Sequence, residues 1–192
     1  GMDAFAESPE WGGSLVIFPF MYYETYGDDS LIRKYYSNMR RYVDYLKTRA
    51  NNGILSFGLG DWYDYGDFRA GFSRNTPVPL VATAHYYMTV MYLVKAAGMV
   101  GNEFDVRYYS SLAHDIMVAF NKCFLDNNTA QYGTGSQCSN ALPLFLHLTQ
   151  SAGEQGVCQP DTNLNKKVLF NLIKDVKAHG DRLTTGDVGN RY

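Results

Sequence analysis

The stretch 80-LVATAHYYMTVMYLVKAA-97 decides the fold class of this chain. It is heavily apolar, contains neither glycine nor proline, and is long enough for about five helical turns. A helix that is apolar all round is buried on all sides, whereas a helix with an apolar stripe has one wet face. The segment 103–124 is of the second kind, because its apolar residues recur at three- and four-residue steps. The two segments therefore predict an αα-hairpin with one inner and one outer helix.

The same pairing occurs on both sides of this hairpin. An apolar helix is expected over residues 15–26, and an amphipathic helix begins after Asp28 or Asp29 and continues for about five turns, as its apolar spacing indicates. Downstream, a short helix over 136–148 precedes an amphipathic helix over 163–178. Three helical hairpins in two concentric layers predict an all-α hairpin array.

The length of 192 residues is that of one domain with a single core. The sequence stops at 189-GNRY-192, where a seventh helix is expected to begin. We therefore expect residues 1–192 to be a single domain, a fragment that forms about half of a ring of αα-hairpins.

Two loops carry the two tryptophans of the chain, Trp11 in 8-SPEWGG-13 and Trp62 in 58-GLGDWYD-64. The second loop lies in an irregular stretch over residues 54–75, and loops of that length in compact domains are usually functional. An indole in a glycine-rich, acid-flanked loop offers a flat apolar face beside hydrogen-bonding carboxylates. Sugars have an apolar C–H face and a polar hydroxyl rim, so these loops predict carbohydrate binding.

Acidic side chains accompany both tryptophans. Glycoside hydrolysis needs one protonated and one ionised carboxyl group at a defined separation, and any two of these side chains could serve. The alternative is that they accept hydrogen bonds from sugar hydroxyls or cap helices. The acidic residues concerned are Glu10, Asp61, Asp64 and Asp67.

Composition and motifs argue against several other classes of protein. The net charge of −2 comes without a Lys/Arg stripe, which disfavours nucleic acid binding, and no apolar run is long enough to span a membrane. Neither the cysteines nor the histidines have metal-ligand spacing, so no metal and no cofactor are expected. Ser136, Cys138 and His147 lack the nucleophile elbow of acyl-transfer enzymes. The start of the chain shows no signal-peptide pattern, and the sequence predicts no compartment.

Ordered strings connect these features to a known family: 9-PEWG-12, 42-YVDYL-46, 58-GLGDW-62, 132-YGTGSQ-137 and 183-LTTGDVG-189. Together they resemble the catalytic domain of bacterial α-L-rhamnosidases, glycoside hydrolase family 78, over almost the whole chain. The resemblance implies an (α/α)6 toroid, of which this chain is a part. It also implies an enzyme that hydrolyses terminal α-L-rhamnosides with inversion, using two glutamates and no metal.

The resemblance implies roles for particular residues as well. Trp11 and Trp62 would wall the subsite that receives L-rhamnose, and Asp61 and Asp64 would lie beside it. Together with Glu10 of the first tryptophan loop, these are the expected substrate-binding residues.

The resemblance places both catalytic glutamates outside this chain. The family's general acid precedes the Pro-Glu-Trp-Gly string, and only a trace of its motif is expected at residues 2–5. The general base follows the Thr-Thr-Gly-Asp string at some distance. We therefore expect no catalytic residue in this chain and no turnover by the isolated chain.

Two alternative functions stay open on sequence alone. One is a non-catalytic αα-hairpin module that binds a protein partner, and the other is a fragment of another toroid glycosidase, glucoamylase-like or trehalase-like. Half of a ring leaves inner-helix faces uncovered, and large exposed apolar patches favour association. The first alternative therefore predicts a homodimer through those faces.

Overall fold

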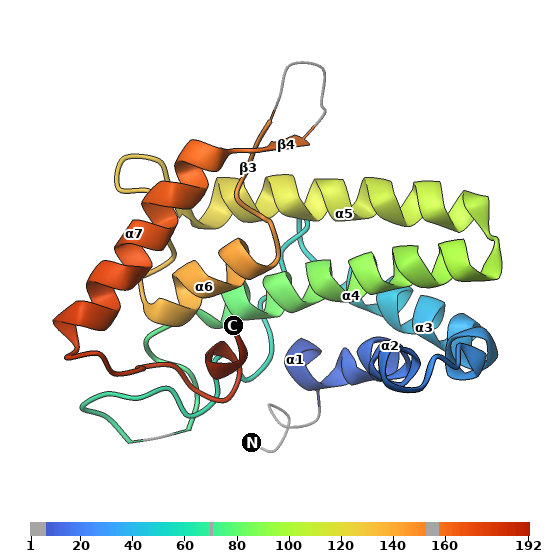
Figure 1. Cartoon of the computed structure of the whole chain (residues 1–192), viewed down its shortest axis with the longest axis horizontal. Coiled ribbons are helices and arrows are strands. Elements are labelled where there is room, and N and C mark those ends of the chain that lie inside the picture. The colour runs from blue at the N-terminus through green and yellow to red at the C-terminus, as the bar shows by residue number, and fades with distance from the viewer. Residues whose placement is uncertain (1–6, 70, 153–157) are drawn as a thin grey trace.

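The computed structural model describes residues 7–69, 71–152 and 158–192 and shows a largely helical chain (Figure 1). Short antiparallel ladders pair β1 (Leu125–Asp126) with β2 (Gln131–Tyr132), and β3 (Gln150–Ala152) with β4 (Cys158–Pro160). A 3-10 turn over Gly189–Arg191 follows the last helix. The predicted all-α hairpin array is confirmed. The helices are α1 (Pro9–Gly12), α2 (Ser14–Tyr26), α3 (Ser30–Arg49), α4 (Val78–Val100), α5 (Glu103–Phe124), α6 (Gln137–Phe145) and α7 (Thr162–Ala178).

The central hairpin consists of α4 and α5, as the apolar stretch 80–97 predicts. Pro79 lies in the first turn of α4, where it costs no helical hydrogen bond, and Gly101 ends the helix with a φ of 78°. Buried side chains run along α4 from Leu80 to Ala97, since α2, α3, α5 and α6 all pack against it. None of the described helices combines the length and the hydropathy needed to cross a bilayer.

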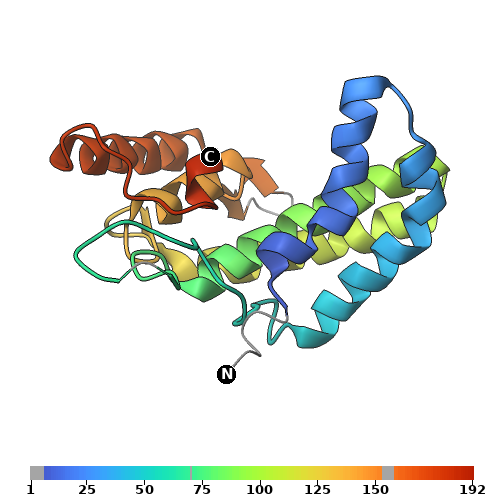
Figure 2. The same cartoon turned by 90° about the horizontal axis from the view of Figure 1, so that it is seen from below.

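The hairpins α2/α3, α4/α5 and α6/α7 form an open arc (Figure 2). The first helices of the hairpins make one contiguous layer, because α2 and α6 both contact α4. The amphipathic partners α3, α5 and α7 each pack against the first helix of their own hairpin. One core runs through this arrangement from Val16 on α2 through Val90 on α4 to Leu142 on α6.

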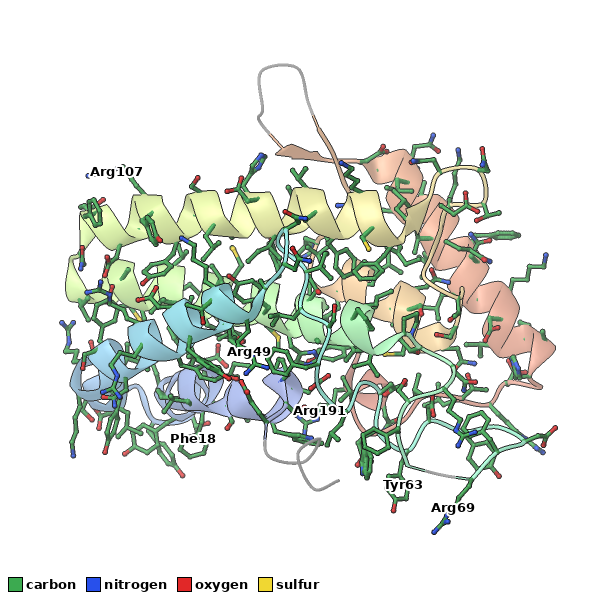
Figure 3. The ribbon with its side chains drawn as sticks, turned by 180° about the vertical axis from the view of Figure 1, so that it is seen from behind. Phe18, Arg49, Tyr63, Arg69, Arg107 and Arg191 are labelled. Carbon is green, nitrogen blue, oxygen red and sulfur yellow. The ribbon has the colours of Figure 1, made fainter. Side chains whose placement is uncertain are left out.

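α2 differs from the predicted burial of the first helix in each pair. Val16, Pro19 and Phe20 are its buried residues, although its sequence is about as apolar as that of α4. An apolar composition shows that burial would stabilise a helix, but it does not show that other elements pack against every face of that helix. The prediction of burial on all sides is therefore wrong for α2. Its exposed apolar side chains are Leu15, Phe18, Met21, Tyr23 and Tyr26, and Phe18 is marked in Figure 3.

Some element boundaries also differ from the predicted ones. α6 ends at Phe145 rather than at residue 148, and His147 has a φ of 54°, which a right-handed helix cannot continue. α7 begins at Thr162, because the Asp161 carboxylate accepts hydrogen bonds from two backbone N–H groups of the first turn. Neither α1 nor the short strands β1 to β4 were predicted, because elements of two to four residues are too short to show a periodic pattern.

Candidate functional site

Irregular segments from distant parts of the sequence meet beside α1 and the N-termini of α4 and α6. They are residues 55–77, 133–136 and 179–188. The hydroxyl of Thr134 donates to the carbonyl of Asn75, and the hydroxyls of Thr76 and Ser136 lie 2.7 Å apart. Three buried carboxylates fix the first of these segments further, one to α1, one to the C-terminal part of the chain and one to the segment itself.

Glu10 links α1 to the loop that precedes Trp62. Its carboxylate accepts hydrogen bonds from the Ser8 hydroxyl and from the Gly60 N–H, the latter at 3.0 Å. Burial raises the pKa of Glu10, against the opposing effect of these hydrogen bonds. Gly58 has a φ of +133°, and a Cβ placed there would lie 2.7 Å from a Glu10 oxygen, so glycine suits the position. The Pro-Glu-Trp-Gly and Gly-Leu-Gly-Asp-Trp strings are therefore one structural unit.

Asp61 links the same loop to the C-terminal segment of the chain. Its side chain is fully buried, and its two oxygens accept hydrogen bonds from the N–H groups of Gly186 at 2.9 Å and Gly189 at 2.7 Å. Burial raises the pKa of Asp61. A Cβ on Gly186 would lie 2.2 Å from the carbonyl oxygen of Trp62, which explains the glycine of the Thr-Thr-Gly-Asp string.

Asp64 closes the irregular loop on itself. Its Oδ2 accepts hydrogen bonds from the backbone N–H groups of Asn75 at 2.5 Å and Arg74 at 2.7 Å, and from the Ser73 hydroxyl at 3.3 Å. The side chain is buried. The loop from residue 64 to residue 75 thus has its two ends fixed together.

The predicted sugar contacts of these carboxylates stay predictions, but their positions now have a structural explanation. Glu10, Asp61 and Asp64 lie beneath the surface and bind loop backbone groups. Asp67 is different, since it is exposed and borders a separate cavity. The sequence could not reveal this bracing role, because the partners of Asp61 lie 125 and 128 residues away.

Both tryptophans lie on the braced segments and are accessible. Trp11 is 40% exposed, and the guanidinium carbon of Arg191 lies 6.0 Å from the centre of its ring system. Trp62 is half-buried and meets Tyr63 and Phe72 edge-on, at centroid distances of 5.1 and 5.3 Å. The Glu10–Gly60 hydrogen bond holds the two tryptophan-bearing segments side by side. The sequence-based predictions missed Arg191, whose only signal was its place two residues after the end of the Leu-Thr-Thr-Gly-Asp-Val-Gly string.

His85 is a packing residue of α4 near the end of the chain. Its Nδ1 lies 2.9 Å from the carbonyl oxygen of Val81, and its Nε2 lies 3.4 Å from the hydroxyl of Tyr192. Burial lowers the pKa of His85 to about 4, so the ring is neutral at pH 7. The Tyr192 ring also packs on Phe145 of α6 at 4.7 Å between centroids. Within the described ranges, no three His, Cys, Asp or Glu side chains gather as metal ligands would.

The sequence of residues 1–192 matches the model of one protein family, described as the bacterial alpha-L-rhamnosidase 6 hairpin glycosidase domain. The chain belongs to this bacterial α-L-rhamnosidase six-hairpin family. Curated relatives named alpha-L-rhamnosidase come from Formosa agariphila, 28% identical over 190 residues, and from Alteromonas sp. strain LOR, 25% identical over 187 residues. Each match covers 95% of the rhamnosidase-family chain and 19% of the relative.

Solved structures agree with this family membership. The alpha-L-rhamnosidase of Dictyoglumus thermophilum superposes with a TM-score of 0.82 at 33% identity, over 97% of this chain and 20% of that one. The Streptomyces avermitilis alpha-L-rhamnosidase, solved in complex with L-rhamnose, gives a TM-score of 0.78 at 22% identity over 93% of this chain and 16% of that one. The second match shows the shared fold.

The rhamnosidase-family chain spans about a fifth of the length of the curated relatives it matches. The helical hairpins and the braced loops therefore correspond to one part of those longer proteins. Residues 2–5, where a trace of the general-acid motif was predicted, lie outside the described residues.

Proposed function

We propose that this chain supplies part of the L-rhamnose subsite of an inverting α-L-rhamnosidase. The observation that carries the proposal is the hydrogen bond from Gly60 N–H to Glu10, which holds the segments of Trp11 and Trp62 together at one end of the helical layer. Accessible indole faces suit the apolar C–H face of a deoxyhexose. The relatives named alpha-L-rhamnosidase, and the rhamnose complex of the S. avermitilis protein, support the choice of sugar.

The proposal gives the buried carboxylates an indirect role. Glu10, Asp61 and Asp64 position the loops, while Trp11 and Trp62 contact the sugar. Preorganised loops bind more tightly than mobile ones, because less conformational entropy is lost on binding. In this proposal the acid and the base of the reaction are not among these residues, and the hydrogen bonds of all three carboxylates to loop backbone groups support that assignment.

Tryptophan fluorescence tests the sugar-binding part of the proposal. The chain has two tryptophans, so Trp11→Phe and Trp62→Phe each leave a single indole reporter. L-Rhamnose is expected to change the emission of both variants saturably, whereas D-glucose at the same concentration is not. Phe104→Leu, a change at a 68% exposed ring on α5, is the matched control and should leave the response unchanged. A response that is equal for both sugars, or absent in both single-tryptophan variants, contradicts the proposal.

Turnover tests the catalytic part. The isolated chain is expected to release no aryl alcohol from an aryl α-L-rhamnoside above the buffer control, because loss of an acid or base alone costs about 10² to 10⁴ in rate. Turnover by the isolated chain above the buffer control would contradict this part of the proposal.

A second proposal follows from the exposed side of α2. Phe18 and Met21 are 59% and 57% exposed, and an uncovered apolar face favours association. We propose that the isolated chain forms a homodimer through this face. Sedimentation velocity at micromolar concentration should show a dimer that Phe18→Asp dissociates, and a clean monomer of the unaltered chain would refute it.

A further inference from the structure

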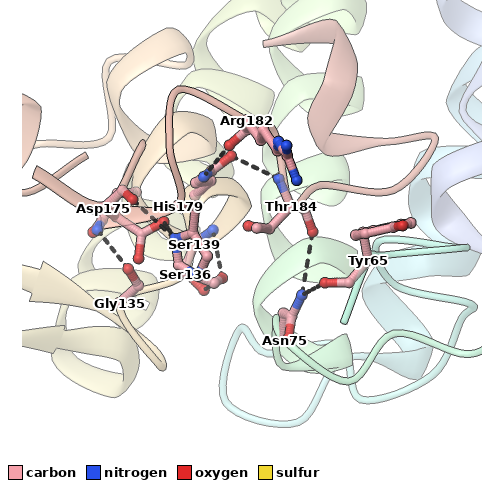
Figure 4. A network of polar contacts seen from close by, with 11 residues as sticks. Tyr65, Asn75, Gly135, Ser136, Ser139, Asp175, His179, Arg182 and Thr184 are labelled. Carbon is pink, nitrogen blue, oxygen red and sulfur yellow. Dashed lines mark hydrogen bonds and ion pairs between the residues drawn. The ribbon is translucent and has the colours of Figure 1, made fainter. Parts of the chain in front are cut away.

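A cavity of about 840 Å³ lies beside the braced loops, and neither tryptophan lines it. Its walls come from separate segments: residues 65–68 of the irregular loop, 134–136 before α6, and 182–184 after α7, with His179 at the end of α7 (Figure 4). The volume is within the range of about 300 to 1,000 Å³ that is typical of sites for small ligands.

Hydrogen bonds fix these walls relative to one another. The carbonyl oxygen of Thr184 accepts hydrogen bonds from the Tyr65 N–H at 3.1 Å and from the Asn75 side-chain amide at 3.2 Å. The Gln137 side chain donates to the carbonyl of Arg182 at 3.1 Å and accepts from the N–H of Thr184 at 2.9 Å (Figure 4). The cavity therefore keeps its shape without a ligand, which lowers the entropic cost of binding.

Two guanidinium groups line the cavity. Arg74 and Arg182 are both exposed and line the cavity, and neither forms an ion pair with another described side chain. The two carboxylates of the lining are those of Asp67 and Asp175. Asp175 Oδ2 lies 3.2 Å from Nδ1 of His179, a contact that is an ion pair only when the imidazole is protonated. Neither carboxylate forms an ion pair with Arg74 or Arg182, so both guanidinium groups are available to a ligand.

Aromatic rings stand beside these cations. Tyr65 is 76% exposed, and the guanidinium carbon of Arg74 lies 5.5 Å from the centre of the Phe68 ring. Leu183, 59% exposed, adds a further apolar surface to the lining. Contact with an aromatic ring keeps a planar guanidinium group in a fixed orientation. A guanidinium group in a fixed orientation can bind a carboxylate through two parallel N–H···O hydrogen bonds.

We propose that this cavity is a second saccharide site that binds a sugar residue carrying a carboxylate, a uronate unit. The carboxylate is bound by Arg74 and Arg182, and the apolar face of the sugar ring lies on Tyr65. The choice of a saccharide rests on the proposed function, whereas the choice of a negative charge rests on the unpaired arginines.

Titration with a matched pair of sugars tests the inference. Methyl β-D-glucuronide and methyl β-D-glucoside differ only in the carboxylate, and their affinities for the 192-residue chain are measured by amide chemical-shift changes in NMR spectra. The glucuronide is expected to bind about tenfold more tightly than the glucoside, with shifts at Tyr65, Arg182 and Thr184. Arg74→Gln and Arg182→Gln should each weaken glucuronide binding by about tenfold.

The controls separate this inference from the rhamnose proposal. Arg107→Gln removes an exposed arginine of α5 that does not line the cavity and that lies far from Arg69 of the irregular loop (Figure 3), so it should leave glucuronide binding unchanged. Circular dichroism of each variant verifies its helix content. Equal affinity for the two sugars, or glucuronide binding that survives both arginine substitutions, overturns the inference. Loss of the tryptophan response to L-rhamnose with intact glucuronide binding refutes the proposed function alone.

Discussion

Asp61→Asn tests whether the buried carboxylate holds the tryptophan loop against the C-terminal segment. The substitution keeps the shape of the side chain but replaces one acceptor oxygen with an NH₂ group, which then faces the N–H of Gly186 or Gly189. One hydrogen bond to a charged acceptor is lost, at about 1.5–3 kcal/mol, and a buried donor is left unpaired, at about 1–3 kcal/mol. Removing a buried charge offsets part of this cost. We expect the free energy of unfolding to fall by about 2–4 kcal/mol.

Urea unfolding followed by circular dichroism measures this change, as a lower midpoint at an unchanged slope. Asp67→Asn is the matched control, because Asp67 is an exposed residue of the same loop. Its effect should stay within about 0.5 kcal/mol. If the two variants lose the same stability, the bracing role of Asp61 is refuted.

The pH dependence of the Asp61→Asn effect provides a second check. Burial raises the pKa of Asp61 in the folded state, so the folded chain holds this proton at a higher pH than the unfolded chain does. The stability from this group is present below the unfolded pKa and is lost as the pH rises through the folded pKa. The variant lacks this titration, so the stability difference between the unaltered chain and the variant should widen as the pH falls from 7 toward about 4.

Three other substitutions and the titration of one histidine have expected outcomes. Gly186→Ala places a methyl group 2.2 Å from the carbonyl oxygen of Trp62 and should lower the free energy of unfolding in urea by at least about 1–3 kcal/mol. Gly98→Ala in α4 is the control, because a Cβ there meets no atom within 4 Å outside the backbone of its own helix. It should raise the free energy of unfolding by about 0.5–1 kcal/mol. The His85 ring should titrate in NMR spectra with a pKa of about 4. Because the unfolded chain binds this proton at a higher pH than the folded chain does, the free energy of unfolding should decrease as the pH falls below about 6.5. A His85 midpoint near 6.5 would contradict its burial. Asn102→Ala removes the side-chain acceptor of the Asp105 N–H at the start of α5. It should lower the free energy of unfolding by about 0.5–2 kcal/mol and lower the melting temperature accordingly. An unchanged melting temperature would show that this N-cap does not stabilise the chain.

The helical hairpins could be predicted from the sequence because their signals are local. Residues 80–97 form a nearly continuous apolar run, residues 103–124 carry apolar periodicity, and Gly101 with Asn102 marks the turn between them. Each of these signals lies within about one turn of the element that it defines. The burial of α2 could not be predicted in this way, since it depends on which neighbours pack against Phe18 and Met21.

The site was predictable in part. Trp11 and Trp62 stood out because a tryptophan in a glycine-rich loop is unusual, and the structure leaves both accessible. The carboxylates beside them looked like ligand-binding groups, but their hydrogen bonds run to backbone amides far away in the sequence. No local pattern distinguishes a carboxylate that accepts a sugar hydroxyl from one that accepts an amide N–H. Only the tertiary fold decides between the two.

The long sequence separation of the Asp61 contacts has a consequence for the order of folding. Each αα-hairpin joins neighbouring segments and closes a short loop, whereas Asp61 must meet amides 125 and 128 residues further along. Local contacts generally form early and distant ones late. We therefore expect the loops braced by Asp61 to assemble after the hairpins have docked, and to open more readily than the helical core. Their amide protons should exchange with solvent ahead of those in the middle of α4.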